Sequence, residues 1–345
     1  MPSDKLKIGV LGAGGFGQVH LSCYQNNENC EIVAVASRTE KHSKMAARKF
    51  SIPYYYHGND WRKLFSENDL DIVSICTPNY LHAPMILEAI KNEVNILCEK
   101  PICISREELN EIESHLNKKS VIFFSSFQKR CIPPIIMFKN VIEKELLGDI
   151  RYIRYRFSHL GPYKSWRPIS EEKWFYEIDK AGGGVLIDLG VHCIDLIRFL
   201  FGDYKNLIFS MKESQCYKIE GEDSAFVIFK VDDNITGEID VSWCFGPLEY
   251  ITLMGNKGWI ILEFVPKYQV FYHFYWKKKL AKNKLIQKMV KWTPTSRNYQ
   301  QQLINHFVNC VINGTQEHPD FHDGKRAVEF VLDAYSFKES QNNIK

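Results

Sequence analysis

The sequence predicts an α/β protein in two parts: a doubly wound, parallel-sheet domain over residues 1–125, and an α+β domain with a large, mainly antiparallel open sheet over residues 126–345. Three observations support this prediction. The chain opens with a strand that breaks into a glycine-rich turn, short apolar segments then alternate with helical ones, and the later strands alternate polar with apolar side chains. A chain of 345 residues is long enough for two domains.

The first part alternates strands and helices with short connections. Its strands are short and largely apolar, as in buried parallel sheets, and are predicted at residues 6–11, 31–36, 71–76, 95–98 and 121–125. Its helices fill the connections and are predicted at residues 17–26, 40–50, 82–91 and 106–117, with Ser105 placed to cap the last. This order is typical of a doubly wound sheet.

The pattern changes after Phe127. Strands with unlike faces, as in an antiparallel sheet, are predicted at residues 150–157, 225–230, 236–243 and 250–254. One long helix is predicted at residues 190–201, with Gly202 as its stop signal. A second domain built mainly on one open sheet follows from this pattern.

The opening segment carries the first functional signal. Residues 6–17 read Leu-Lys-Ile-Gly-Val-Leu-Gly-Ala-Gly-Gly-Phe-Gly, a strand that ends in G-x-G-x-x-G. Such a turn holds the pyrophosphate of a dinucleotide: Gly12 permits the tight turn, Gly14 lets backbone approach phosphate, and Gly17 lets the helix pack on the strand. The helix that opens here, with Gly15 and Phe16 in its first turn, then faces the anion with its N-terminus.

The end of the second strand bears on the choice of cofactor. In this type of fold an acidic residue there usually takes the ribose hydroxyls. Residues 37–39 read Ser-Arg-Thr, without a carboxylate, and a hydroxyl with a guanidinium suits a 2′-phosphate. Ser37 and Arg38 therefore predict a preference for NADP(H), with NAD(H) as the alternative.

Two later stretches carry groups suited to proton transfer. Residues 99–101 read Glu-Lys-Pro directly after a predicted strand, at the sheet edge where ligands bind. Asp188, His192 and Asp195 have the spacing i, i+4 and i+7, so a helix would bring them onto one face. Carboxylates beside an imidazole raise its basicity and fix its tautomer, as proton abstraction from an alcohol requires. Three glycines at residues 182–184 are expected to permit close approach to a ligand.

The sequence resembles the Gfo/Idh/MocA family of oxidoreductases over nearly its whole length. The resemblance rests on the G-x-G-x-x-G turn, on Thr-Pro-Asn-x-x-His at residues 77–82, on the Glu-Lys-Pro motif, and on the glycine block that leads to Asp188-x-x-x-His192. It implies a Rossmann domain, a reacting carbinol flanked by Lys100 and His192, and Asp188 completing the catalytic set. Either Lys100 or His192 is the principal base. The resemblance also implies a homodimer or homotetramer formed through the open sheet.

The resemblance extends the expected site beyond the glycine turn. Further cofactor contacts are expected from Thr77, Pro78, Asn79, His82, Glu99, Lys100 and Gln128. Of these, His82 is expected mainly to orient its loop. Substrate contacts are expected from His159, Trp166, Arg167, Trp174 and Asp195. The aromatic members of this set fit core or oligomer contacts equally well.

These expectations describe a cytoplasmic enzyme that transfers a hydride between nicotinamide C4 and a carbinol or keto carbon of a sugar, sugar derivative or cyclitol. Two alternatives belong to other classes: a glycosidase that uses NAD for transient redox chemistry, and a non-enzymatic sensor that binds NADP. The intact set of Lys100, Asp188 and His192 argues against a sensor, because a pure binder has no need of it.

Composition excludes several other classes. The net charge of +3 gives no argument for nucleic acid, and no apolar stretch reaches the length of a membrane span. The ten cysteines show no C-x-x-C pair and no ligand-like spacing. We therefore expect reduced thiols in a cytoplasmic protein, with no disulfide framework and no metal site.

One segment departs from the rest in charge. Residues 264–316 contain no Asp or Glu but eight lysines and one arginine, and seven of those lysines lie at residues 277–291. The simplest interpretation is a basic amphipathic excursion from the sheet. The alternatives are a lid over a phosphorylated or nucleotide-linked sugar, and a surface for an acidic partner or a membrane.

Overall fold

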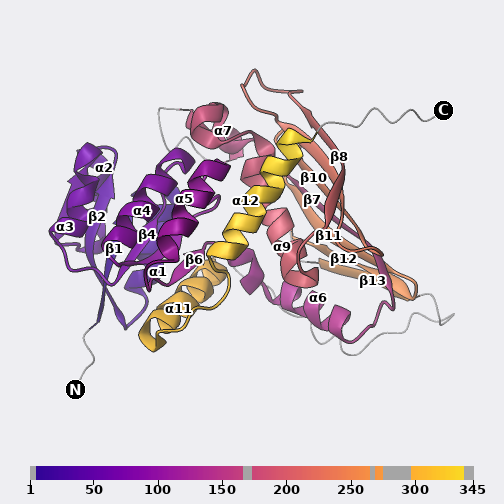
Figure 1. Cartoon of the computed structure of the whole chain (residues 1–345), viewed down its shortest axis with the longest axis horizontal. Helices are drawn as coiled ribbons and strands as arrows, with labels where there is room; N and C mark the ends of the chain where they lie inside the picture. The colour runs from indigo at the N-terminus through magenta and orange to yellow at the C-terminus, as the bar shows by residue number, and fades with distance from the viewer. Residues whose placement is uncertain (1–4, 166–172, 265–268, 275–296, 338–345) are drawn as a thin grey trace. The chain divides into compact units, whose positions relative to one another are not determined.

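The computed structural model describes residues 5–165, 173–264, 269–274 and 297–337, which fall into two compact units (Figure 1). The first unit contains the described residues up to Gln128 together with those from Arg297 to Lys325, and the second contains the others. Each unit is built on its own sheet, and the predicted fold class is confirmed. The late return of the chain to the first unit is a feature that the sequence pattern did not indicate.

The first unit is a parallel sheet with the strand order β3-β2-β1-β4-β5-β6, the arrangement of a Rossmann domain. Its strands are β1 Leu6–Leu11, β2 Cys30–Ser37, β3 Tyr54–His57, β4 Ile72–Ile75, β5 Asn95–Cys98 and β6 Phe123–Ser125. Its helices are α1 Gly15–Gln25, α2 Glu40–Phe50, α3 Lys63–Ser66, α4 His82–Lys91, α5 Arg106–Leu116 and α11 Arg297–Asn313. Strand β4 is fully buried, and β1 is buried over its last four residues, which explains their apolar runs.

The second unit is a seven-stranded sheet with the order β13-β12-β11-β7-β10-β9-β8, antiparallel except for the β7–β10 pair. Its strands are β7 Ile150–Ser158, β8 Asn206–Glu213, β9 Ser224–Lys230, β10 Thr236–Ser242, β11 Leu248–Gly255, β12 Gly258–Glu263 and β13 Gln269–Phe274. Its helices are α6 Pro133–Glu143, α7 Pro162–Ser165, α8 Ile178–Ala181 and α9 Val191–Phe201. Helix α12, Phe321–Ser336, begins in the first unit and continues into the second.

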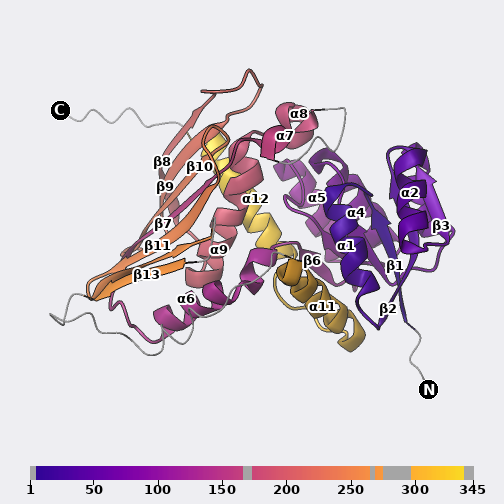
Figure 2. The same ribbon diagram turned by 180° about the vertical axis from the view of Figure 1, so that it is seen from behind.

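The two faces of this second sheet differ, as the alternating sequence predicts. Helices α6, α9 and α12 gather on one face (Figures 1 and 2), and every second residue of β9 and β12 is buried. The alternate residues of β7 and β10 form an ion-pair ladder: Arg154 Nε lies 2.7 Å from Glu238 Oε1, Arg154 Nη2 lies 3.3 Å from Asp240 Oδ2, and Arg156 pairs with Asp240. Among the described residues, we find no helix with the length and apolarity needed to cross a membrane.

Candidate active site

The glycine turn joins β1 to α1 in the first unit. Gly12 has φ +100°, and a Cβ atom there would lie 2.4 Å from the carbonyl oxygen of Cys76. A Cβ at Gly17 would lie 1.8 Å from the carbonyl oxygen of Gly12. Helix α1 starts after Gly14, which provides no side-chain cap, and its first turn carries no acidic residue. The glycine turn is therefore closely packed against the carbonyl groups of Cys76 and Gly12. The uncapped N-terminus of α1 is suited to bind an anion.

The adenosine end of the expected site lies where β2 leads into α2. Ser37 ends β2, and Thr39 caps α2 by accepting a hydrogen bond from the backbone N–H of His42 at 3.4 Å. A cavity of about 580 Å³ is shared by the glycine turn, α1 and α2, and its lining residues are Ala13, Gln18, His42, Met45, Arg48 and Lys49. Its lining thus holds Arg48, Lys49 and a histidine, and no carboxylate.

The loop after β4 is held by a buried histidine. His82 Nδ1 lies 2.7 Å from the carbonyl oxygen of Pro101, and His82 Nε2 lies 2.8 Å from that of Thr77. Burial lowers the pKa of His82, and the two carbonyl groups only partly offset this effect. The imidazole therefore ties the loop that contains Thr77 and buried Asn79 to the segment that contains Lys100.

Glu99 is fixed by a buried polar network at the carboxyl end of β5. His20 Nδ1 lies 3.0 Å from Ser74 Oγ, and His20 Nε2 lies 2.9 Å from Glu99 Oε1. Ser126 Oγ donates to the same carboxylate oxygen at 2.7 Å, and Gln300 Nε2 donates to Ser126 Oγ at 3.2 Å. Burial alone would raise the pKa of Glu99, but the hydrogen bonds and charge around it hold the pKa below its ordinary value. The carboxylate thus stays ionised and anchors the backbone that carries the next residue, the candidate catalytic lysine.

The second unit brings three of the expected residues together. Asp188 lies in a π-helical turn, Leu186–Gly190, that leads into α9, so it precedes the regular helix that carries His192. Trp243 Nε1 donates to Asp188 Oδ2 at 3.3 Å, and His159 Nε2 lies 4.0 Å from the same oxygen. The ring of Phe157 lies 6.1 Å from that of His159 and 6.5 Å from that of His192, measured between centroids. The buried carboxylate of Asp188 and the buried imidazole of His159 thus lie 4.0 Å apart, and the rings of His159 and His192 both lie near that of Phe157.

The glycine block before Asp188 packs against protein rather than opening space. A Cβ at Gly184 would lie 1.9 Å from the carbonyl oxygen of Glu222, and one at Gly183 would lie 2.1 Å from Tyr335 Oη. The Glu222 side chain accepts hydrogen bonds from the backbone N–H of Gly184 at 3.1 Å, from that of Leu186 at 2.8 Å, and from Tyr335 Oη at 2.9 Å. Burial raises the pKa of Glu222 despite these donors. Gly183 and Gly184 therefore lie against Tyr335 and Glu222, which clamp the turn that carries the candidate aspartate. The expected approach of a ligand to this glycine block stays a prediction.

Asp195, an expected substrate contact, is held by another protein group. Arg130 Nε lies 3.2 Å from Asp195 Oδ1 and 3.0 Å from Oδ2, and Arg130 Nη2 lies 2.6 Å from Oδ1. Both side chains are buried, and the guanidinium also lies over the ring of Phe199 at 5.3 Å. This geometry gives Asp195 a structural role in joining the start of the second unit to α9.

Other expected residues are placed as follows. Gln128 opens the short 3-10 turn Gln128–Cys131, and the ring of Trp174 stacks on that of Phe175 with centroids 3.8 Å apart. Trp166, Arg167 and the basic segment 277–291 lie outside the described residues. Sequence reasoning missed Trp243, Glu222 and the network around His20. Their partners are tens of residues away in the chain, so no local sequence motif predicts these contacts.

Comparison with known families agrees with this geometry. A family model described as an oxidoreductase family with an NAD-binding Rossmann fold matches residues 6–127. A second model, described as the GFO/IDH/MocA C-terminal domain, matches residues 135–261. The chain belongs to the Gfo/Idh/MocA family. The resemblance inferred from the motifs is thereby confirmed, and the Rossmann part is the family's NAD-binding domain.

Family members of established activity are distant in sequence. Levoglucosan dehydrogenase from Pseudarthrobacter phenanthrenivorans is 28% identical over 209 residues, which span 58% of this chain and 52% of that protein. Myo-inositol 2-dehydrogenase from Thermotoga maritima is 21% identical over 264 residues, 75% of each chain. The alignment thus spans about half of the first relative and three quarters of the second.

A solved structure extends the likeness to the whole fold. A levoglucosan dehydrogenase in complex with NADH and L-sorbose superposes with a TM-score of 0.81 at 20% identity, over 96% of this chain and 95% of that one. At 20% identity, this superposition establishes that the two proteins share a fold.

Proposed function

We propose that this family member is an NADP(H)-dependent dehydrogenase or reductase that acts on a hydroxyl-bearing carbon of a sugar, sugar derivative or cyclitol. The observation that carries the proposal is the buried group of Asp188, His159 and His192 in the second unit, in a chain whose first unit is an NAD-binding Rossmann domain. The named dehydrogenases among its relatives act on compounds of this class, which supports the choice of substrate.

The proposed proton transfer uses the two motif residues in different roles. His192 accepts the proton of the substrate hydroxyl, and the ammonium of Lys100 stabilises the negative charge that develops on the oxygen. Asp188, held by the indole N–H of Trp243, orients the base and offsets the positive charge that it acquires. Lys100 as the base with His192 as the stabilising group is the alternative assignment.

The proposed cofactor site follows the glycine turn. The uncapped first turn of α1, with Gly14, Gly15 and Phe16, would hold the pyrophosphate. The bound nicotinamide dinucleotide supplies the hydride acceptor for oxidation or the hydride donor for reduction. Thr77, Pro78, Asn79 and the Glu99–Lys100 backbone would contact its other end.

The preference for NADP(H) rests on the charge of the adenosine end. Ser37 and Arg38 provide a hydroxyl and a guanidinium at the end of β2, and the cavity between the glycine turn, α1 and α2 is lined by the further basic residues His42, Arg48 and Lys49. A 2′-phosphate gains charge-assisted hydrogen bonds from such groups, whereas the ribose hydroxyls of NADH gain little.

The first experiment measures dissociation constants of the apoprotein for NADPH and NADH by fluorescence titration. We expect NADPH to bind at least 10-fold more tightly, a difference of about 1.4 kcal/mol. Arg38→Ala should abolish this preference, whereas Lys44→Ala, a basic change on α2 outside the cavity lining, should preserve it. Tighter binding of NADH by the parent protein would overturn the choice of cofactor and leave the oxidoreductase proposal standing.

The second experiment follows nicotinamide absorbance with a panel of sugars, keto-sugars and cyclitols. Lys100→Ala and His192→Ala should each lower kcat by roughly 10²–10⁴-fold, the range of a general acid–base contribution. Full turnover in either variant would refute its role. Cleavage of a glycoside without net change in absorbance would support the glycosidase, and tight binding without turnover of any compound would support the sensor.

Assembly and location complete the proposal. We expect a homodimer or homotetramer formed through the sheet face that carries the Arg154–Glu238–Asp240 ladder, where Met254 and Met211 are about two-fifths exposed. All ten cysteines are free thiols, which supports a reducing compartment such as the cytoplasm. Light scattering on the purified protein tests the assembly, and a monomer at micromolar concentration would contradict it.

A further inference from the structure

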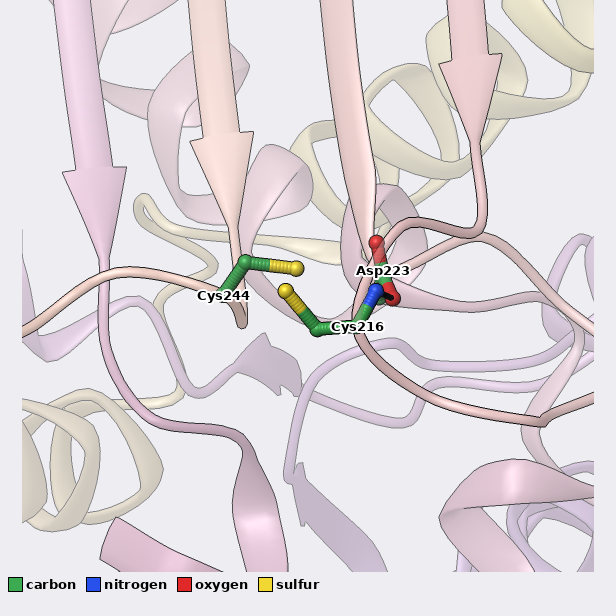
Figure 3. Close-up of side chains that lie close together, drawn as sticks. All are labelled: Cys216, Asp223 and Cys244. Carbon is green, nitrogen blue, oxygen red and sulfur yellow. Dashed lines mark hydrogen bonds between the residues drawn. The ribbon is translucent and has the colours of Figure 1, made fainter.

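A cluster of two thiols and a carboxylate lies at one end of the second sheet (Figure 3). Cys216 and Asp223 belong to the segment between β8 and β9, and Cys244 follows the end of β10. The three potential ligand atoms all lie within 4.8 Å of one another, and the two thiols point toward each other. The residues are 28 positions apart at most, without the close pairing of a zinc motif, and the sequence analysis accordingly predicted no metal site.

The backbone around the cluster fixes the carboxylate. Asp223 Oδ2 accepts hydrogen bonds from the N–H groups of Cys216 at 2.7 Å and Tyr217 at 2.9 Å, whereas Oδ1 accepts one from Gln215 at 2.9 Å. Because a carboxylate oxygen has two lone-pair sites, Oδ1 keeps one for a further partner. The loop is thus wrapped around a carboxylate, one of whose oxygen atoms lies within 4.8 Å of both sulfur atoms.

The third ligand is also supported by its neighbours. Ser224 Oγ donates to Cys244 Sγ at 3.6 Å, and the backbone N–H of Cys244 donates to Ser242 Oγ at 3.0 Å. Ser224 and Ser242 are paired across β9 and β10, and their hydroxyls lie 2.9 Å apart. A hydroxyl that donates to a cysteine sulfur is the kind of outer contact that orients a thiolate ligand and stabilises its charge.

We propose that Cys216, Asp223 and Cys244 bind one Zn²⁺ ion, with water as the fourth ligand. Zinc favours tetrahedral sites of thiolate, imidazole and carboxylate, and a pair of thiolates selects it over the hard cations Mg²⁺ and Ca²⁺. Cys216 is exposed, which gives the ion a path of entry and leaves a side open for water. On binding, two S–H bonds break, two Zn–S bonds form, and both protons leave to solvent.

The other clusters of metal-ligand residues in the described parts of the chain suit zinc less well. His318, Asp320 and Asp323 are joined by an existing ion pair, His318 Nδ1 to Asp323 Oδ2 at 2.8 Å. The group of His306, Cys310 and Glu317 offers one thiol. The dithiolate site is therefore the one to which a soft divalent ion should bind most tightly.

The proposed ion would act as a clip. It would join the loop before β9 to the end of β10, and Cys244 directly follows Trp243, whose indole holds Asp188. Because a metal that binds only the folded state stabilises it by mass action, zinc should raise the thermal stability of the protein. The inference concerns zinc binding alone and stands whether or not the proposed activity is confirmed.

The experiment titrates the reduced, chelator-treated full chain with Co²⁺ and then displaces it with Zn²⁺. We expect one equivalent of cobalt with a thiolate charge-transfer band and the visible spectrum of a tetrahedral ion, and full loss of both on addition of zinc. Cys216→Ser and Cys244→Ser each remove a ligand and should raise the dissociation constant for Co²⁺. The increase should exceed the roughly 10–100-fold that follows from losing a residue that only hydrogen-bonds to a ligand. Cys131→Ser, which removes a thiol outside the cluster, should bind as the parent does.

Two further variants separate ligand loss from misfolding. Cys216→His replaces an exposed ligand by another zinc ligand and should retain one equivalent of cobalt with a weaker thiolate band. Ser224→Ala should weaken binding by roughly 10-fold. The proposal fails if the Cys216→Ser/Cys244→Ser double variant binds cobalt like the parent, or if the reduced parent takes up none. A Cys216–Cys244 disulfide that forms under mild peroxide, in a protein that takes up no metal when reduced, would identify a redox pair instead.

Discussion

The indole N–H of Trp243 lies 3.3 Å from Asp188 Oδ2, so a fully buried aromatic side chain on the strand end donates to the carboxylate that precedes α9. This bond joins β10 and its following residue to the π-helical turn Leu186–Gly190. Because Asp188 lies outside the regular helix, its position depends on such contacts rather than on helical spacing. Trp243 is therefore a positioning residue for the proposed centre.

Trp243→Phe removes this donor while keeping an aromatic ring. A hydrogen bond to a charged group contributes about 1.5–3 kcal/mol, so kcat should fall by roughly 10–100-fold if the bond persists in the transition state. The KM for the sugar should change less. The control is Trp259→Phe, measured by the same steady-state kinetics, because Trp259 lies on β12, three strands away from β10 in the sheet. An unchanged kcat in Trp243→Phe would show that Asp188 does not need the indole.

Gly184→Ala tests the clamp on the glycine block. The added Cβ would lie 1.9 Å from the Glu222 carbonyl oxygen, and backbone on both sides would have to shift. We expect a loss of about 1–3 kcal/mol in the free energy of unfolding, as for other overpacked sites. Gly246→Ala, where the new methyl group meets nothing within 4 Å, should be near neutral. Equal stabilities of the two variants in urea would contradict the clamp.

Glu99→Gln tests the buried network through its pH dependence. The pKa of Glu99 is lower in the folded protein than its ordinary value of 4.5, so the unfolded chain binds the proton more strongly. The resulting stability is present above about pH 4.5 and is lost as the pH falls through the folded pKa. In urea unfolding experiments between pH 7 and pH 4, the free energy of unfolding should fall less steeply with decreasing pH for Glu99→Gln than for the parent protein. Glu111→Gln, an exposed change on α5, should leave the parent slope intact.

Asp195→Asn distinguishes a structural role from a substrate contact. Removing one partner of a buried ion pair leaves Arg130 uncompensated, and such changes cost about 3–5 kcal/mol. We expect a large fall in the denaturation midpoint, with a KM close to that of the parent for the protein that remains folded. Asp69→Asn, which removes an exposed pair with Lys7, should leave the midpoint unchanged. A raised KM at parental stability would instead restore Asp195 to the substrate site.

The sequence by itself determined the two sheets and the glycine turn. Apolar runs, alternation of side chains and turn glycines act over a few residues, so a one-dimensional pattern is enough to predict them. Gly17 shows this, because the close contact that requires it is made by the carbonyl oxygen of Gly12 in the same β1–α1 unit.

Tertiary structure alone decided which side chains meet. Gln300 reaches Ser126 across 174 positions, Glu222 clamps Gly184 across 38, and Trp243 finds Asp188 across 55. These contacts depend on strand order and register, and a slip of one residue would turn each side chain of a strand to the other face. The same physical reason hid the Cys216–Asp223–Cys244 cluster, which exists only because β9 and β10 pair with Ser224 opposite Ser242.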